Sequence, residues 1–176
     1  WSLDETSGTR YDAHGSNDLT DINTVLYDTG KVSNAAKFVG ANSESLSIAS
    51  GVGLGLSRTG ANTMALWFQR TTEFNNSILI RSGGNDYFRI TAAFNNTMEF
   101  TVYDWNGETN RNLTATDPWV DDTWHCIFAS YDSSDDEMSI SVDNGTPTTS
   151  TPSITVDTGT KAFEILAPVT TATVLI

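Results

Sequence analysis

The segment Met64–Gln69, which reads Met-Ala-Leu-Trp-Phe-Gln, decides how this chain folds. Successive side chains of an extended strand point to opposite faces, so Met64, Leu66 and Phe68 share one face and the intervening residues share the other. Both faces are largely apolar, which is typical of a strand that is covered on both sides. We therefore predict a strand in the middle of a sheet.

Alternating segments on its C-terminal side predict a hairpin. Apolar Phe88, Ile90 and Ala92 alternate with polar residues, and a second alternating segment, 99–103, follows the turn-prone pair Asn95-Asn96. No segment places apolar residues at helical spacing over three turns. The regular structure is therefore expected to be β throughout.

The C-terminal half continues this pattern. Trp124, Cys126 and Phe128 are predicted to form an inward-facing row, and a strand over 138–142 is expected to follow it. The left-handed turn residues Asp143-Asn144-Gly145 then favour a tight hairpin. The β-branched ending, residues 170–176, predicts a last strand. Several strands at this spacing predict an all-β, two-sheet antiparallel β-sandwich that forms a single domain over residues 1–176.

The composition limits the classes of molecule that this protein can bind. The 22 acidic and 9 basic residues give a formal net charge of −13, so nucleic acid and anionic membranes would be repelled. No run of about 18 apolar residues predicts a membrane span. The same acidic excess would attract calcium. The chain starts at Trp1 rather than Met, which suggests a mature segment or a piece of a longer protein.

Motifs of catalysis are missing from the sequence. The single cysteine, Cys126, allows no internal disulfide, and neither His14 nor His125 accompanies a G-x-S-x-G nucleophile motif. A hydrogen-bonded structural role is expected for His125. A retaining glycosidase needs two carboxylates about 5–5.5 Å apart, yet Glu99 and Glu164 have no acidic partner along their strands. We therefore expect a protein that is not an enzyme.

Several motifs together resemble one family. The opening Trp1–Thr9 with Asp12 and Gly15–Leu19 is similar to the start of laminin G-like, concanavalin A-like jelly-roll domains. Further similar segments follow in the family's order, at Gly30–Gly40, Ser45–Ile48, Met64–Phe68, Trp124–Asp132 and Ser141–Gly145. The resemblance implies a curved antiparallel sandwich that serves outside the cell in recognition and in some members binds one calcium ion. The family's closing strand beside the first strand is missing, so residues 169–176 either replace it or it lies beyond the sequence given.

One loop has the composition of a sugar-binding site, because sugar faces stack on aromatic rings while hydroxyl groups form directional hydrogen bonds. The predicted ligand-binding residues are Tyr103, Asp104, Trp105 and Asn106, with Asn85 and Asp86 on a neighbouring loop. The alternative is that Trp105 only covers the edge of the sandwich.

Two acidic clusters are candidate calcium sites. Calcium takes six to eight oxygen ligands, which loops supply from carboxylates, amides and carbonyls. We predict a single structural calcium ion held by Asp12, Asn17 and Asp18; the second cluster is Asp132, Asp135 and Asp136. The alternative is that these are ordinary turn residues.

These observations predict a non-catalytic recognition or adhesion module, carbohydrate-binding and lectin-like, at the surface of a cell or virion or secreted. Its partner would be a glycan or a surface protein, and a homo-oligomer is compatible with the sequence. The alternative is a structural display or decoration domain of a virion fibre or filament. A glycoside hydrolase is the third, weaker reading.

Overall fold

Strands make up nearly all the regular structure of this computed structural model. It describes residues 1–48, 54, 60–71, 77–82, 88–93, 97–104, 109–116, 122–154, 162–166 and 173–176. Within these ranges the strands form two sheets, and every pairing is antiparallel. A single short 3-10 turn, η1 (Gly40–Asn42), is the one helical element among the described residues.

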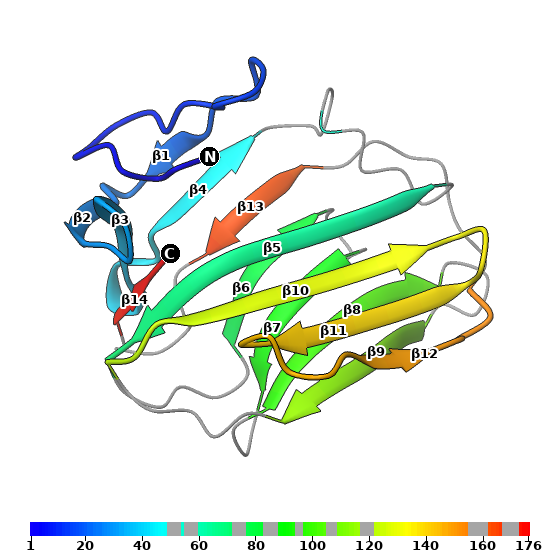
Figure 1. The fold of residues 1–176 in the computed structure, drawn as a ribbon. Helices are drawn as coiled ribbons and strands as arrows, with labels where there is room; N and C mark the ends of the chain where they lie inside the picture. The colour runs from blue at the N-terminus through cyan, green and yellow to red at the C-terminus, as the bar shows by residue number, and fades with distance from the viewer. Residues whose placement is uncertain are drawn as a thin grey trace.

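The front sheet contains the long strands nearest the viewer in Figure 1. Its order is β12 (Thr148–Ser150), β11 (Glu137–Val142), β10 (His125–Asp132), β5 (Ala61–Arg70), β14 (Thr173–Leu175), β3 (Asn34–Val39) and β2 (Leu26–Thr29). The predicted hairpin turn follows β11, and Asp143 and Asn144 have φ of 49° and 64°. The expected strand at the C-terminal end is β14.

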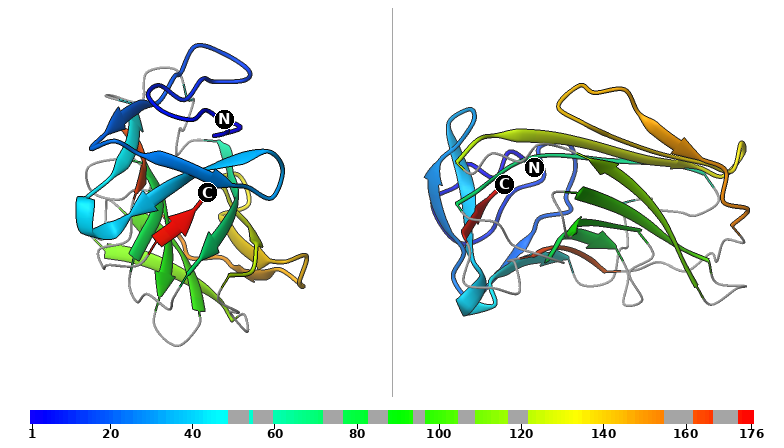
Figure 2. Two further views of the ribbon diagram at one scale, coloured as in Figure 1. Left: turned by 90° about the vertical axis from the view of Figure 1, so that its left-hand side faces the viewer. Right: turned by 90° about the horizontal axis from the view of Figure 1, so that it is seen from below.

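The back sheet lies behind it, as the view from below in Figure 2 shows. Its order is β1 (Thr20–Ile22), β4 (Ser45–Ile48), β13 (Phe163–Leu166), β6 (Ser77–Ser82), β7 (Phe88–Ala93), β8 (Thr97–Asp104) and β9 (Thr109–Thr116). β7 and β8 pair antiparallel with Phe88 opposite Val102, which confirms the predicted hairpin. The two layers confirm the predicted all-β sandwich.

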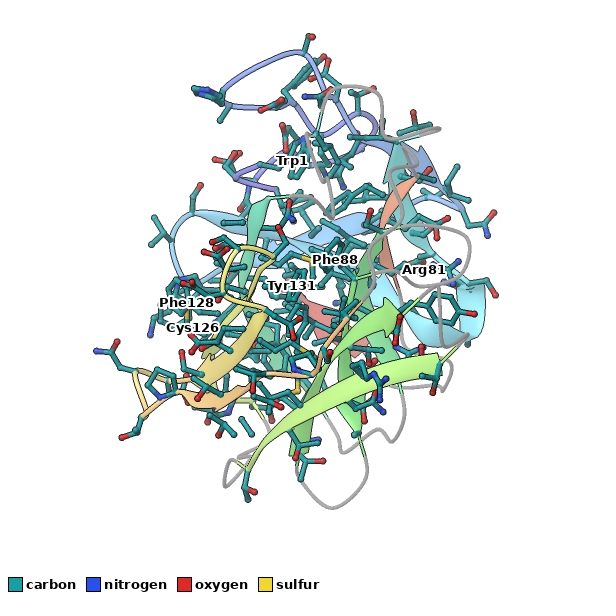
Figure 3. The ribbon with its side chains drawn as sticks, turned by 90° about the vertical axis from the view of Figure 1, so that its right-hand side faces the viewer. Trp1, Arg81, Phe88, Cys126, Phe128 and Tyr131 are labelled. Carbon is teal, nitrogen blue, oxygen red and sulfur yellow. The ribbon has the colours of Figure 1, made fainter. Side chains whose placement is uncertain are left out.

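The core lies between the sheets and is rich in aromatic rings. Phe88 stacks on Phe100 with ring centroids 6.5 Å apart, and Tyr131 of the front sheet lies 6.3 Å from Phe88. Figure 3 shows Phe88 and Tyr131 in the interior, between Arg81 on one side of the molecule and Phe128 on the other. The rings therefore join the two layers.

The predicted inward row of β10 is wrong. The residues that face the core are His125, Ile127, Ala129 and Tyr131, whereas Phe128 on the opposite face is 47% exposed. Both faces of this strand carry apolar residues, so alternation alone does not distinguish them. The outer face of β5 is likewise less covered than expected, because Trp67 is 45% exposed. No helix of the described residues is long and apolar enough to cross a membrane.

Candidate functional site

A row of polar side chains crosses the outer face of the back sheet. The inner face is fixed by buried apolar residues such as Ile80, Ile90 and Phe100, so the intervening residues point outward. The strand registers align these outward positions across neighbouring strands. From β4 to β9 the polar row reads Ser47, Glu164, Arg81, Arg89, Thr101 and Asn112, with Glu99 beside Thr101.

Two arginine–glutamate pairs order the centre of this row. Nε of Arg81 donates a hydrogen bond of 2.6 Å to Oε2 of Glu164. Nη2 of Arg89 lies 3.8 Å from Oε1 of Glu99 and donates to Oγ1 of Thr101 at 3.3 Å. The Thr101 hydroxyl donates in turn to Oε1 of Glu99 at 3.2 Å. The charged groups are therefore held in defined positions by rigid strands.

The row is partly shielded from solvent. The Arg89 and Glu99 side chains are 18% and 20% exposed, and Thr101 is fully buried. Hydrogen bonds that involve charged groups are stronger than neutral ones, and partial burial reduces their screening. Buried Thr91, next to the row, has a hydroxyl without a hydrogen-bond partner among the described residues. This surface can offer guanidinium donors and carboxylate acceptors to one polar ligand.

The predicted sugar-binding loops follow the C-terminal ends of β6 and β8, so they leave the sheet along one side of this row. β7 is antiparallel to both β6 and β8, so β6 and β8 run in the same direction. Their last residues, Ser82 and Asp104, therefore lie at the same end of the strands. Tyr103 is half-buried and contacts the core. Like Thr101, it occupies a position of β8 that alternation assigns to the outer face. The other predicted ligand residues of these loops lie outside the described residues: Asn85, Asp86, Trp105 and Asn106.

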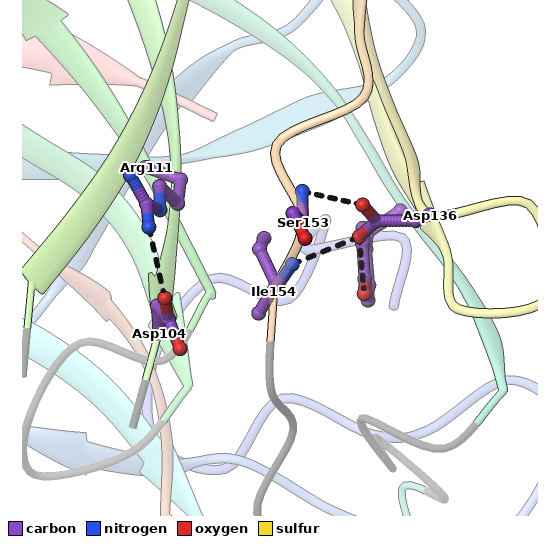
Figure 4. A network of polar contacts seen from close by, with 6 residues as sticks. Asp104, Arg111, Asp136, Ser153 and Ile154 are labelled. Atoms are coloured by element: carbon purple, nitrogen blue, oxygen red, sulfur yellow. Dashed lines mark hydrogen bonds and ion pairs between the residues drawn. The ribbon is translucent and has the colours of Figure 1, made fainter. Parts of the chain in front are cut away.

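Asp104 is the more buried of the two predicted ligand residues that the structure describes. It is 4% exposed, and its Oδ2 accepts a hydrogen bond of 3.0 Å from Nη2 of Arg111. Figure 4 shows this pair together with Asp136, whose carboxylate accepts hydrogen bonds from the backbone N–H groups of Ser153 and Ile154. The geometry gives the Asp104 carboxylate a partner within the protein.

The first predicted calcium cluster forms one compact loop. Asp12 accepts hydrogen bonds from the N–H groups of His14 and Asn17 at 2.9 and 3.1 Å, and Asp18 accepts one from Asp12 N–H at 2.9 Å. The N–H groups of His14 and Asn17 lower the pKa of the Asp12 carboxyl. The indole Nε1–H of Trp1 donates to the backbone carbonyl of Asn17 at 2.8 Å, so that oxygen has a partner within the protein.

The second cluster stabilises a turn. Oδ1 of Asp132 accepts from both the N–H and the hydroxyl of Ser134, at 2.8 and 2.7 Å. Asp136 accepts from the Tyr131 hydroxyl at 3.3 Å as well as from the 153–154 backbone. Within the described ranges no three His, Cys, Asp or Glu side chains gather as a metal site would require. The calcium ion stays a prediction.

Sequence reasoning missed the polar row. Its members lie on separate strands, and only the fold brings Glu164 beside Arg81 and Glu99 beside Arg89. The usable signal was a charged residue between core residues, as at Arg89 between Phe88 and Ile90.

No protein-family model matches the sequence, and no curated protein matches it. Among solved structures, the binding domain of Paraclostridial Mosquitocidal Protein 1 aligns over 97% of this chain and 46% of its own, with a TM-score of 0.73 and 8% identity. The binding domain of Botulinum Neurotoxin DC, in complex with SialylT, aligns over 97% and 45%, with a TM-score of 0.65 and 9% identity. The Emp47p carbohydrate recognition domain aligns over 96% and 85%, with a TM-score of 0.58 and 12% identity.

This chain spans about half the length of the two toxin binding domains that it matches. Identities this low show a common fold and leave the ligand open. The chain therefore has the jelly-roll β-sandwich fold of lectin-like domains.

Proposed function

We propose that this chain is a non-catalytic carbohydrate-binding module of a secreted, cell-surface or virion-surface protein, and that a glycan lies across the polar row of the back sheet. The observation that carries the proposal is the pair of ion-paired arginines, Arg81 and Arg89, directly opposite each other on β6 and β7. The likeness to a carbohydrate recognition domain supports it at the level of fold.

The chemistry of the row suits a sugar. Each sugar hydroxyl is both donor and acceptor, and guanidinium and carboxylate groups side by side satisfy both roles. Side chains held on strands lose little conformational entropy on binding, because their partners already fix them. Glu99 adds a second carboxylate, which the buried Thr101 hydroxyl holds in place. Tyr103, which lies on the same face of β8 as Glu99, would extend this surface toward the end of that strand.

The spacing of the carboxylates favours binding over hydrolysis. Glu99 and Glu164 lie on β8 and β13, with β6 and β7 between them. Three strand spacings separate their backbones by about 14 Å, and the strands that carry Arg81 and Arg89 lie between them. Each carboxylate is instead paired with an arginine.

A glycan array on the purified domain tests this proposal, with Arg81→Ala and Arg89→Ala as the variants. We expect selective binding by the native domain and at least a tenfold loss of affinity in both variants. Lys37→Ala is the matched control, because it removes the Lys37–Asp28 ion pair on the β2–β3 hairpin of the front sheet. This control should bind as the native domain does.

Trp105→Ala, measured on the same array, tests the predicted loop separately from the row. A loss of binding with an unchanged melting temperature would extend the site to that loop. A folded native domain that binds no glycan, or arginine variants that bind normally, would refute the proposed site. Release of reducing sugar from a polysaccharide panel would refute the non-catalytic assignment.

A further inference from the structure

The two arginine–glutamate pairs of the polar row differ in how closely their charged groups approach. Nε of Arg81 donates directly to Oε2 of Glu164 at 2.6 Å. In the second pair, Nη2 of Arg89 lies 3.8 Å from Oε1 of Glu99, which is longer than an N–H···O hydrogen bond. The first pair is therefore closed by a direct bond, whereas the second pair is open.

A threonine hydroxyl bridges the open pair. Thr101 of β8 lies directly opposite Arg89 of β7, and Glu99 lies two residues before it on the same face of β8. Nη2 of Arg89 donates to Oγ1 of Thr101 at 3.3 Å, and this hydroxyl donates to Oε1 of Glu99 at 3.2 Å. One hydroxyl thus acts as acceptor and as donor at once, which links the guanidinium to the carboxylate without a direct bond.

Burial decides which of these three side chains a ligand can reach. Thr101 is fully buried. The Arg89 and Glu99 side chains keep 18% and 20% of their surface exposed. A ligand on the outer face of the back sheet can therefore contact Arg89 and Glu99, and Thr101 can affect binding only through the positions of these two.

We propose that Thr101 is a positioning residue, which holds Arg89 and Glu99 apart so that one uncharged hydroxyl group of a glycan binds between them. This inference rests on the proposed glycan site and names the ligand group that the Arg89–Glu99 pair recognises. The ligand hydroxyl would accept a hydrogen bond from the guanidinium and donate one to the carboxylate, the same two bonds that the Thr101 hydroxyl makes from within the sheet. A charged group fits worse, because Glu99 repels an anion and Arg89 repels a cation.

Removal of the Thr101 hydroxyl should close the pair. Thr101→Val replaces the hydroxyl by a methyl group of similar size, so nothing then bridges Arg89 and Glu99. The two charged groups are then expected to bond directly, as Arg81 and Glu164 do, and a direct bond takes up the donor and the acceptor that the ligand hydroxyl needs. The new ion pair replaces the two lost hydrogen bonds, so glycan affinity should fall while the melting temperature changes little.

Affinity measurements on the native domain and on threonine variants test the proposal. The probes are lactose, cellotriose and mannotriose, together with the uncharged glycans that the native domain binds on the array. Thr101→Val should bind at least tenfold more weakly, with a melting temperature within about 3 °C of the native value. Thr101→Ser keeps the hydroxyl and should retain affinity within about threefold. Thr149→Val, the same substitution on exposed β12 of the front sheet, is the matched control and should bind as the native domain does.

A double-mutant cycle shows whether Thr101 acts through Arg89. In the Arg89→Ala background, Thr101→Val should cause no further loss of affinity, whereas the losses from two independent residues would multiply. If Thr101→Val does not fold, Thr101→Ala takes its place in every comparison.

Failure of this inference can be told apart from failure of the glycan site. If Arg89→Ala loses binding while Thr101→Val binds as tightly as the native domain, the positioning role is overturned and the glycan site stands. The same holds if Thr101→Ser binds as weakly as Thr101→Val. A native domain that binds no glycan overturns the glycan site and this inference with it.

Discussion

Nδ1 of His125 lies 2.6 Å from Oδ2 of Asp143, which ties the first residue of β10 to the turn after β11. The other carboxylate oxygen of Asp143 accepts the Cys126 N–H at 2.8 Å, and the Asp143 N–H donates to the Cys126 carbonyl at 2.9 Å. His125 is 4% exposed. The hydrogen bond expected for this histidine is therefore present.

Asp143→Ala should lower the free energy of unfolding by about 1–3 kcal/mol, because it removes two hydrogen bonds to β10 at partly buried groups. Urea unfolding at pH 7 measures the change. Asp135→Ala, an exposed aspartate in the β10–β11 turn, is the control and should change stability by less than about 0.5 kcal/mol. Equal stability of the two variants would contradict the structural role of Asp143.

Local patterns were enough to predict most of the fold. The alternation at Phe88–Ala92 and the turn at Asp143–Gly145 depend only on neighbouring residues, and both appear where expected. Neighbouring residues alone did not show which face of β10 points to the core. His125 can face the interior only because Asp143, in a turn beyond the next strand, supplies its partner.

The candidate site was harder to predict than the fold, because strand order assembles it. Glu164 reaches Arg81 only after β13 has been placed beside β6, and no short motif encodes this pairing. The sequence did identify Glu99 and Glu164 as carboxylates without an acidic neighbour. It could not show that each would meet an arginine.

Chelation should lower the melting temperature if calcium binds at Asp12, Asn17 and Asp18. A ligand at 100 times its Kd stabilises the folded state by about 2.7 kcal/mol, so saturating calcium against EDTA should give a clear shift. Asp12→Asn should abolish that shift, whereas Asp132→Asn, in the second cluster, should retain it. Identical transitions of the native domain in calcium and in EDTA would remove the ion from the description of this protein.

The Tyr131 hydroxyl should make the fold sensitive to base. Burial, followed by the charge of Asp136, raises the pKa of Tyr131 to about 12 from its ordinary value of 10.0. The side chain is 1% exposed, and its hydroxyl lies 3.3 Å from Oδ1 of Asp136. The folded state therefore holds this proton more tightly than the unfolded state does.

Because the folded pKa is the higher one, the stabilisation from Tyr131 is complete below pH 10 and declines as the pH rises toward 12. The loss should amount to about 2–3 kcal/mol over that window. Urea unfolding of the native domain and of Tyr131→Phe, at several values between pH 8 and pH 12, measures it. The variant should lose less stability over the window than the native domain, because phenylalanine has no proton to release. Tyr11→Phe, at a position that is 62% exposed, should decline as the native domain does. Parallel curves for the native domain and Tyr131→Phe would mean that the base sensitivity arises elsewhere in the chain.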